Sequence, residues 1–337
     1  MALVLYAGEA EGREASPPFT ASDHWVSNFM RRFEISLRRR TNLTVLGDET
    51  LVDRAVRYMV FLQAQLPSID LERTVLMDET AVYFEDARQT TLDFVGARHV
   101  VVRSTGFSSM RITVVLAVSA TGRKLPPLLV WKGKSKPTFE KKPGPLYVAQ
   151  QPRAWVDSEL LKKWIDIAFP LVAQGEGKCL VWDSMRAHIS KVIKAKCASR
   201  KISMCVVPGG LTPYLQAGDI GIYKSFKDLL YVEINAWKES DQVEYTRFGN
   251  PRMPSVDTVC EWVRRAWRDT EESTVMHSIE AAGFARDPSD WFIAKHDVYG
   301  ARFREKWAEE SKDDENADLL NLSALDDALD DINLVDE

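Results

Sequence analysis

The sequence predicts an α/β fold, a mixed sheet with helices packed on it. Three observations predict it: short apolar β-rich runs occur along the middle of the chain, segments of helical periodicity separate them, and 45% of the 337 residues are hydrophobic. A chain of this length and composition can bury one substantial core with small flanking units. From residue 74 the predicted order is strands, helix, strand, helix, strand, helix.

The predicted strands are short and end at turn residues. They are expected at residues 74–78, 100–103, 111–118, 125–131, 179–182 and 202–207. Thr121-Gly122 predicts a hairpin turn, and Pro208-Gly209-Gly210 stops the last strand.

The predicted helices carry apolar residues at intervals of three and four. They are expected at residues 23–42, 49–66, 157–173, 191–201, 220–237 and within 255–310. Asp157 or Ser158 and Ser190 are suited to cap two of them, and Pro67 stops the helix at 49–66. That helix lies before the first strand, so residues 46–70 are expected to be a helical linker. Residues 1–22 show no clear period and are expected to be disordered.

Charge is distributed unevenly along the chain. Residues 308–337 contain twelve acidic residues and one lysine, whereas residues 1–307 contain 43 basic and 37 acidic residues, a net charge of +6. A basic body with an acidic tail, residues 311–337, is typical of proteins that bind polyanions. The tail has three interpretations: a solvated disordered segment, a helix that docks on a partner, or a mimic of DNA that covers the body.

Several classes of protein are not expected. No apolar run reaches the roughly 18–20 residues of a membrane helix, so no membrane partner is predicted. The N-terminus lacks the basic start and long apolar middle of a secretion signal. The four cysteines form no CxxC pair and are expected to be reduced, buried thiols; they are Cys179, Cys197, Cys205 and Cys260.

Three aspartates stand where predicted elements begin or end. Asp78 closes the first strand, Asp183 closes the strand at 179–182, and Asp219 follows a Gly- and Pro-containing loop and opens a helix. Taken singly, an aspartate in such a place is commonly a helix cap or turn residue. Strand ends can also bring side chains of neighbouring strands together on one edge of a sheet. Three carboxylates brought together there would repel each other unless they bind Mg²⁺ or Mn²⁺, and two such ions can catalyse phosphodiester cleavage.

The segments around these aspartates resemble those of a known family. VLMDET, VWDSMRAHIS and PGGLTPYLQAGDIGIYKSF resemble the catalytic segments of pogo-type DDE transposases, a mariner-related group that includes centromere protein B and jerky-like proteins. The hairpin ending in LLVWKGK is also similar. WVSNFMRRFEISLRRRT resembles the end of the second helix-turn-helix unit in the family's DNA-binding region. The likeness runs from about Trp25 to about Lys238, with the motifs in the family's order.

The resemblance implies a ribonuclease H-like catalytic domain over residues 71–240, followed by a helical C-terminal region over residues 241–310. Asp78, Asp183 and Asp219 match the three metal-binding aspartates of the family. It implies that a metal-activated water cuts one strand at the element end and that the freed 3′-hydroxyl then attacks target DNA. It also implies double-stranded DNA as partner, a homodimer and a nuclear protein.

Two further polar residues stand near the aspartates in the sequence. His188 matches a family position and is expected either to orient Asp183 or simply to pack near it. Glu79 follows Asp78, and if the strand continues its side chain points to the opposite face. Glu79 is therefore a poorer candidate ligand than Asp78.

The sequence departs from the family pattern in the third motif and at the N-terminus. Gly218 stands where the family usually has leucine, and its backbone freedom could loosen the site at Asp219. The family usually has two helix-turn-helix units, whereas this chain begins inside the second, so residues 23–45 are expected to be a partial DNA-binding unit. The acidic tail has no match in the pattern.

Two basic segments are candidate DNA contacts. The first is the predicted N-terminal helix with Arg31, Arg32, Arg38, Arg39 and Arg40. The second is the loop with Lys132, Lys134 and Lys136, beside Trp131, which could stack on a base. In each case the alternative is ordinary structure: an amphipathic helix with a solvated basic face, or a solvated loop with Trp131 in the core.

Three functions therefore remain open from the sequence. The leading one is a DDE transposase catalytic unit, truncated at its N-terminus. The second is a non-enzymatic DNA-binding protein derived from such a transposase, and the third is a catalytically idle copy. The intact Asp78, Asp183 and Asp219 favour the enzyme.

Overall fold

The computed structural model describes residues 22–33, 46–85, 107, 110–133, 138–170 and 175–310. The predicted disordered segment 1–22 except for Ser22, the predicted strand at 100–103 and the acidic tail lie outside the described residues. The chain divides into two compact units, Met1–Thr44 and Val45–Glu337.

The first unit is described only by helix α2 (Asp23–Arg32) and the residues beside it. Ser22 caps this helix, because its Oγ accepts a hydrogen bond from the Trp25 backbone N–H at 3.3 Å. Trp25 and Phe29 stack with ring centroids 5.1 Å apart. Phe33 remains 56% exposed, so within this unit the apolar side of the helix is only partly covered.

The second unit is built on a seven-stranded mixed sheet with strand order β4-β5-β3-β2-β1-β6-β7. Its strands are β1 Thr74–Tyr83, β2 Arg111–Ser119, β3 Leu128–Lys132, β4 Thr138–Lys142, β5 Leu146–Gln151, β6 Lys178–Asp183 and β7 Ile202–Val207. The β2–β3 hairpin is confirmed, with Gly122 at φ +89° in its turn. β1 pairs with β6 in parallel, as does β6 with β7.

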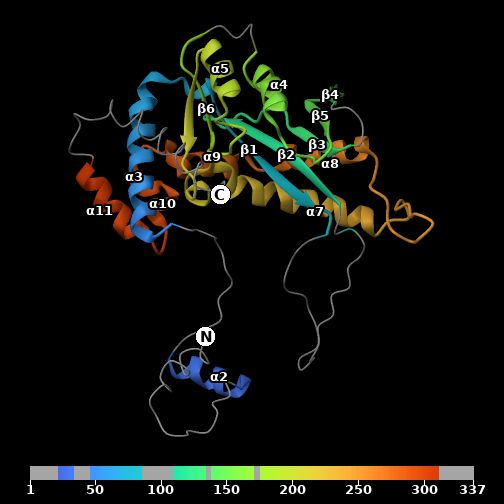
Figure 1. The fold of residues 1–337 in the computed structure, drawn as a ribbon, viewed down its shortest axis with the longest axis horizontal. Coiled ribbons are helices and arrows are strands. Elements are labelled where there is room, and N and C mark those ends of the chain that lie inside the picture. Colours follow the sequence, from blue (N-terminus) through green and yellow to red (C-terminus); the bar gives the residue numbers. More distant parts are fainter. Residues whose placement is uncertain are drawn as a thin grey trace. The chain divides into compact units, whose positions relative to one another are not determined.

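The helices of the second unit cover both faces of the sheet (Figure 1). They are α3 Asp48–Gln65, α4 Ser158–Ala168, α5 Lys191–Ser199, α6 Thr212–Leu215, α7 Tyr223–Lys238, α8 Val256–Asp269, α9 Glu272–Ile279, α10 Phe292–Lys295 and α11 Gly300–Glu310. Short 3₁₀ turns lie at Leu66–Ser68, Leu71–Arg73 and Pro288–Asp290, and π-helical turns lie at Gly218–Ile222 (η3) and Glu280–Phe284 (η4). Side chains of α4 and α5 pack on one face, whereas those of α3, α7 and α8 belong to the core on the other face.

Three features differ from the expectations. β1 does not end at Asp78 but continues to Tyr83, because β2 pairs with it along the whole length, as far as Tyr83 opposite Arg111. The helix expected to be a linker, α3, is packed into the core of the second unit, with Leu51, Met59 and Leu62 completely buried. The helices after residue 255 share this same core with the sheet.

All four cysteines are buried free thiols, as expected. No helix among the described residues is both long enough and apolar enough to cross a membrane.

Candidate active site

Asp78 and Asp183 lie on neighbouring parallel strands at matching positions. The β1–β6 pairing ends with Leu76 opposite Val181, and two residues further along each strand stand the two aspartates. Because side chains alternate along a strand, Asp78 is on the same face as Leu76, and Asp183 is on the same face as Val181. Both apolar residues belong to the same core. The fold therefore brings these two predicted residues together at one end of the sheet.

His188 connects Asp183 to a fourth carboxylate. Its Nδ1 is 2.6 Å from Asp183 Oδ1, and its Nε2 is 3.2 Å from Glu79 Oε1. The imidazole is completely buried and stacks on Trp182, with ring centroids 4.6 Å apart and an interplanar angle of 1°. Glu79 lies on the opposite face of β1 from Asp78, as strand alternation predicts, but it reaches the acid cluster through His188. This contact was not predicted, because it joins residues 109 positions apart.

The third aspartate is placed by an irregular turn. After β7, the short helix α6 leads to Gln216, whose backbone carbonyl accepts a hydrogen bond from the Asp219 N–H at 3.1 Å. Asp219 is the second residue of the π-helical turn η3, which runs directly into α7. The expected helix opening at Asp219 is therefore present, with π-helical geometry in its first turn.

Gly218 is explained by its neighbour Tyr223. A Cβ at position 218 would stand 2.3–2.5 Å from two ring carbons and the hydroxyl oxygen of Tyr223, which is closer than atoms can approach. The Tyr223 ring thus occupies the space that a side chain at position 218 would need. Its packing fixes the turn before Asp219, where the sequence alone indicated a looser backbone.

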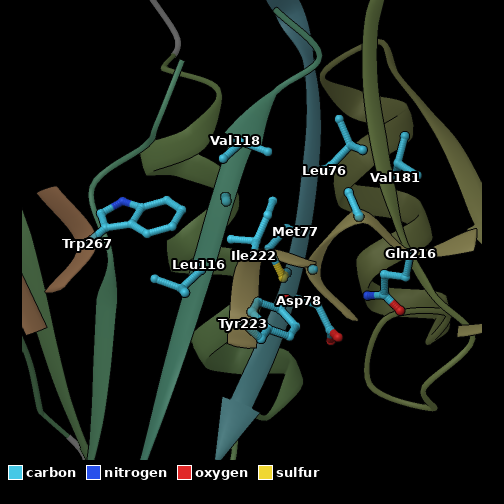
Figure 2. A pocket seen from close by; sticks show the side chains of 13 residues that line it. Leu76, Met77, Asp78, Leu116, Val118, Val181, Gln216, Ile222, Tyr223 and Trp267 are labelled. Carbon is cyan, nitrogen blue, oxygen red and sulfur yellow. The ribbon is translucent and has the colours of Figure 1, made fainter. Parts of the chain in front are cut away.

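A small cavity lies beside these groups. It has a volume of about 20 Å³, enough for one water molecule, and its lining includes Asp78, Gln216 and Tyr223 (Figure 2). In Figure 2 the Tyr223 ring and the Gln216 side chain flank the Asp78 carboxylate. Gln216 is 5% exposed, and neither polar atom of its amide has a hydrogen-bond partner among the residues that the structure describes. A buried amide of this kind is costly unless a ligand or water satisfies it.

The pKa values show how strongly these acids influence one another. Burial, then the charges of Glu79 and Asp183, raises the pKa of Asp78 well above its usual range. Burial raises the pKa of Asp219 to about 6, with Lys227 opposing the shift and Asp183 adding to it. Burial alone would lower the pKa of His188, but the carboxylates of Glu79 and Asp183 outweigh it and raise that pKa to about 10. His188 is therefore a buried cation at neutral pH.

Two further groups at the cluster were missed by sequence reasoning. Lys227 stands two turns after Asp219 on the helix; burial lowers its pKa, and the charges of Asp219 and Asp78 act against that change. Burial and the surrounding acids, Asp78 and Asp219 foremost, raise the pKa of Tyr223 well above its usual range. The spacing of residues 219, 223 and 227, one helical turn apart, was the signal that could have identified both groups.

The carboxylates of Asp78, Asp183 and Asp219 are chemically suited to bind a divalent metal ion, although they are not close enough together to bind one as they stand. Among the described residues, no three His, Cys, Asp or Glu side chains have the spacing to hold an ion as they stand. Carboxylate oxygens are the ligands that Mg²⁺ and Mn²⁺ prefer. Burial, with neighbouring acids adding to it, raises the pKa values of Asp78 and Asp219, and a bound cation would favour their charged forms. His188 and the Met185 N–H both contact Oδ1 of Asp183, which leaves Oδ2 for another ligand.

The structure places only some of the predicted DNA contacts. Arg31 and Arg32 are exposed on α2, and Lys132 is exposed at the end of β3. Trp131 packs against the core, so it is not an exposed stacking residue. The remaining candidates, Arg38, Arg39, Arg40, Lys134 and Lys136, lie outside the described residues.

The sequence profile of the DDE superfamily endonuclease family matches residues 109–278, half of the chain. The chain belongs to this family. The matched part of the chain contains Asp183 and Asp219, and Asp78 lies before it.

Relatives among characterised proteins carry pogo-type names. The chain is 26% identical to "Pogo transposable element with KRAB domain" of Mus musculus over 278 residues, which are 81% of this chain and 46% of that protein. It is 27% identical to the Homo sapiens protein of the same name over 268 residues, 78% of this chain and 44% of that protein. The chain thus spans less than half the length of these relatives.

The fold of the chain resembles that of a solved transposase structure. The chain superimposes on the "Mos1 transposase paired-end complex with left transposon end" with a TM-score of 0.51 at 15% identity, covering 86% of this chain and 79% of that chain. The predicted ribonuclease H-like mixed sheet flanked by helices and the resemblance to the mariner and pogo group are both confirmed.

Proposed function

We propose that the chain is the catalytic unit of a pogo-type DDE transposase, which cuts DNA at element ends and joins the freed 3′-hydroxyl ends to target DNA. The observation that carries this proposal is the matching position of Asp78 and Asp183 on β1 and β6, with the charge of Asp219 close enough to interact with that of Asp183. Both the family and the pogo-type relatives support it.

In this proposal Asp78, Asp183 and Asp219 hold Mg²⁺ or Mn²⁺. When bound, such ions activate an attacking oxygen and stabilise the leaving oxygen of a phosphodiester. His188 holds Asp183 by its Oδ1 and neutralises Glu79, which keeps the Oδ2 of Asp183 directed to the ion. The Gln216 amide lines the cavity beside Asp78. Lys227 interacts with the charges of Asp219 and Asp78, and it offers a positive charge to a phosphate.

The partner of this activity is double-stranded DNA, both the element ends and the target. The similar Mos1 structure is a paired-end complex with a transposon end, which supports this partner and a homodimer that holds two ends. We further propose that the protein acts in the nucleus, where chromosomal DNA is the target. We assign phosphate contacts to the exposed residues Arg31, Arg32 and Lys132. We assign the same role to five residues outside the described part of the chain: Arg38, Arg39, Arg40, Lys134 and Lys136.

One observation favours a second candidate, a transposase-derived DNA-binding protein without activity. Within the described parts of the chain no three His, Cys, Asp or Glu side chains have metal-ligand spacing. A nicking assay separates the two functions. It uses duplex DNA carrying the inverted-repeat ends of the encoding element, with Mg²⁺ or Mn²⁺.

We expect Asp183→Asn to lower the nicking rate by on the order of 100-fold or more, since changing a residue that only orients a metal ligand already costs about 10–100-fold. Asp228→Asn is the matched control, because Asp228 is an exposed acid on α7 that pairs with Lys224. Equal rates for wild type and Asp183→Asn would defeat the assignment. Binding of DNA without nicking by the wild type would favour the second candidate.

A further inference from the structure

Two exposed aromatic rings and an arginine lie together outside the acid cluster. Trp155 is 62% exposed and Tyr83 is 46% exposed. The guanidinium carbon of Arg111 stands 5.8 Å from the centroid of the Tyr83 ring and 6.0 Å from that of the Trp155 ring. We call these three residues the aromatic platform. Large exposed rings lose hydrophobic stabilisation, so a cluster of them points to a binding role.

Arg111 is held in place by the sheet and by a chain of hydrogen bonds. It pairs with Tyr83 at the last position of the β1–β2 register. Its Nη2 donates to Thr113 Oγ1 at 3.3 Å, and that hydroxyl donates to the Ala154 carbonyl at 2.9 Å. Its Nε is buried and has no hydrogen-bond partner within the described part of the chain. The guanidinium is thus fixed between the rings with donor capacity left over.

The backbone that presents Trp155 is strained. Ala154 has φ +51°, in the left-handed region that residues other than glycine avoid, and it is 2% exposed. Its N–H donates to the Gln151 carbonyl at 3.1 Å, which closes a tight turn. Backbone strain of this kind is often found at functional sites. Here the strained turn leaves the Trp155 side chain exposed to solvent.

The surroundings of the platform carry positive charge. Lys132 is exposed and lies opposite Gln151 in the β3–β5 register. Gln151 is followed in the chain by the exposed residues Arg153 and Trp155. Rings next to basic side chains are the arrangement that binds single-stranded nucleic acid, in which bases stack and phosphates meet cations.

The platform also has a defined place relative to the acid cluster. Tyr83 follows Asp78 by five residues on β1, a separation of roughly 16 Å along the strand. This corresponds to about five nucleotides of stacked strand. The pairing of β1 with β6 ends at Leu76, whereas the pairing of β1 with β2 continues to Tyr83. Beyond Asp78, β1 and β2 therefore extend without β6 beside them. Tyr83 lies on the opposite face from Asp78, so a strand reaching both sites has to leave the path of a straight duplex.

We propose that Trp155 and Tyr83, with Arg111 between them, bind an unpaired base of the DNA strand that passes through the acid cluster. This inference rests on the proposed function, which identifies the bound strand as DNA that passes through the acid cluster. Arg111 covers one face of the rings, and the exposed face of Trp155 receives the base. Arg153 and Lys132 contact the adjacent phosphates.

The test measures stacking directly and does not require cleavage. Duplex oligonucleotides with a single-stranded extension carry 2-aminopurine at one extension position at a time, and stacking on a ring quenches its fluorescence. Full-length protein is titrated without divalent metal. We expect quenching at one or two neighbouring positions in the wild type, retained by Trp155→Phe.

Trp155→Ala should abolish this quenching and weaken binding of the extended DNA by about 5- to 150-fold, the range found for losing one stacked base. Affinity for blunt duplex should stay unchanged. Phe248→Ala is the matched control, because Phe248 is 74% exposed with the Arg247 guanidinium 4.5 Å from its ring centroid. It should behave as wild type.

Each outcome bears on one of the two proposals. Quenching that is absent in the wild type, or equal in wild type and Trp155→Ala, overturns the platform and leaves nicking by the acid cluster intact. Trp155-dependent quenching in a protein that does not nick DNA supports the platform and defeats the proposed catalytic function.

Discussion

At the scale of single residues, the buried cation His188 is the feature that organises the acid cluster. Sequence reasoning placed His188 near Asp183, because five residues separate them in a recognisable motif. It did not identify Glu79 as the second partner, since strand alternation alone directs Glu79 away from Asp78. The contact depends on how the segment after β6 folds back, and no local pattern encodes that path.

Removing His188 should destabilise the protein. His188→Ala leaves the partly buried Glu79 and Asp183 without their cation, so we expect the free energy of unfolding at pH 7 to fall by about 3 kcal/mol in metal-free buffer. Urea unfolding followed by circular dichroism measures it. His277→Ala, at an exposed position on α9, serves as the control and should change little. Unfolding free energies equal to wild type would show that His188 does not hold the two carboxylates.

The raised pKa of Asp219 predicts a pH dependence of stability. With a pKa near 6 in the folded state and about 3.9 when unfolded, Asp219 keeps its proton longer in the native chain. Its contribution is therefore fully present below about pH 4 and is lost as the pH rises through 6.

Asp219→Asn, which cannot ionise, should match wild type at pH 4 and exceed it by about 1–3 kcal/mol at pH 7 without metal, the lower values reflecting solvent screening. Unfolding free energies measured in urea at several pH values with a chelator present provide the test. A variant that is less stable than wild type at pH 7 would contradict the shift. Added Mg²⁺ should stabilise wild type more than the variant.

At the scale of elements, apolar runs with clear ends were the most predictable. β7, the β2–β3 hairpin and the helix capped at Asp157 follow from local signals, because periodicity and capping act within a few residues. The extension of β1 to Tyr83 was missed, since its polar residues gain their strand geometry by pairing with β2. The π-helical turn at Gly218 was missed for a related reason: it depends on the packing of Tyr223.

The close contact between positions 218 and 223 gives a stability prediction. Gly218→Ala places a Cβ within 2.5 Å of the Tyr223 ring and should lower the free energy of unfolding by about 1–3 kcal/mol. The loss should shrink in a Tyr223→Leu background, where the ring is gone. Gly209→Ala is the control, because the nearest atom to its Cβ would be Ser184 Oγ at 3.6 Å. Additive effects of the two substitutions at 218 and 223 would rule out the contact.

At the scale of the whole molecule, the second unit draws its core from widely separated parts of the chain. Gln63 Nε2 on α3 donates to the Gly283 carbonyl at 2.7 Å, and Lys306 on α11 pairs with Asp53 on α3. Sequence reasoning assigned α3 to a linker because it precedes the first strand. The sequence of α3 indicates an apolar face but does not indicate which element packs against it. The contact between Gln63 and Gly283 joins residues 220 positions apart, and local periodicity does not predict such a contact.

Removing α3 should therefore prevent folding of the second unit. A chain that begins at residue 46 should unfold cooperatively in urea, whereas one that begins at residue 68 exposes the core beside Gly283 and should not. Circular dichroism and size-exclusion chromatography distinguish the two. Equal cooperativity of both chains would show that α3 is dispensable, as a linker would be.

The packing of Tyr223 against Gly218 also constrains how the third motif can evolve. The space beside Asp78 holds either an aromatic ring from position 223 or a side chain from position 218, and it cannot hold both. In an alignment of related chains, large residues at 218 should therefore coincide with small ones at 223, and the reverse. A glycine at position 218 is then the counterpart of a large side chain at position 223, and it is compatible with an intact catalytic centre.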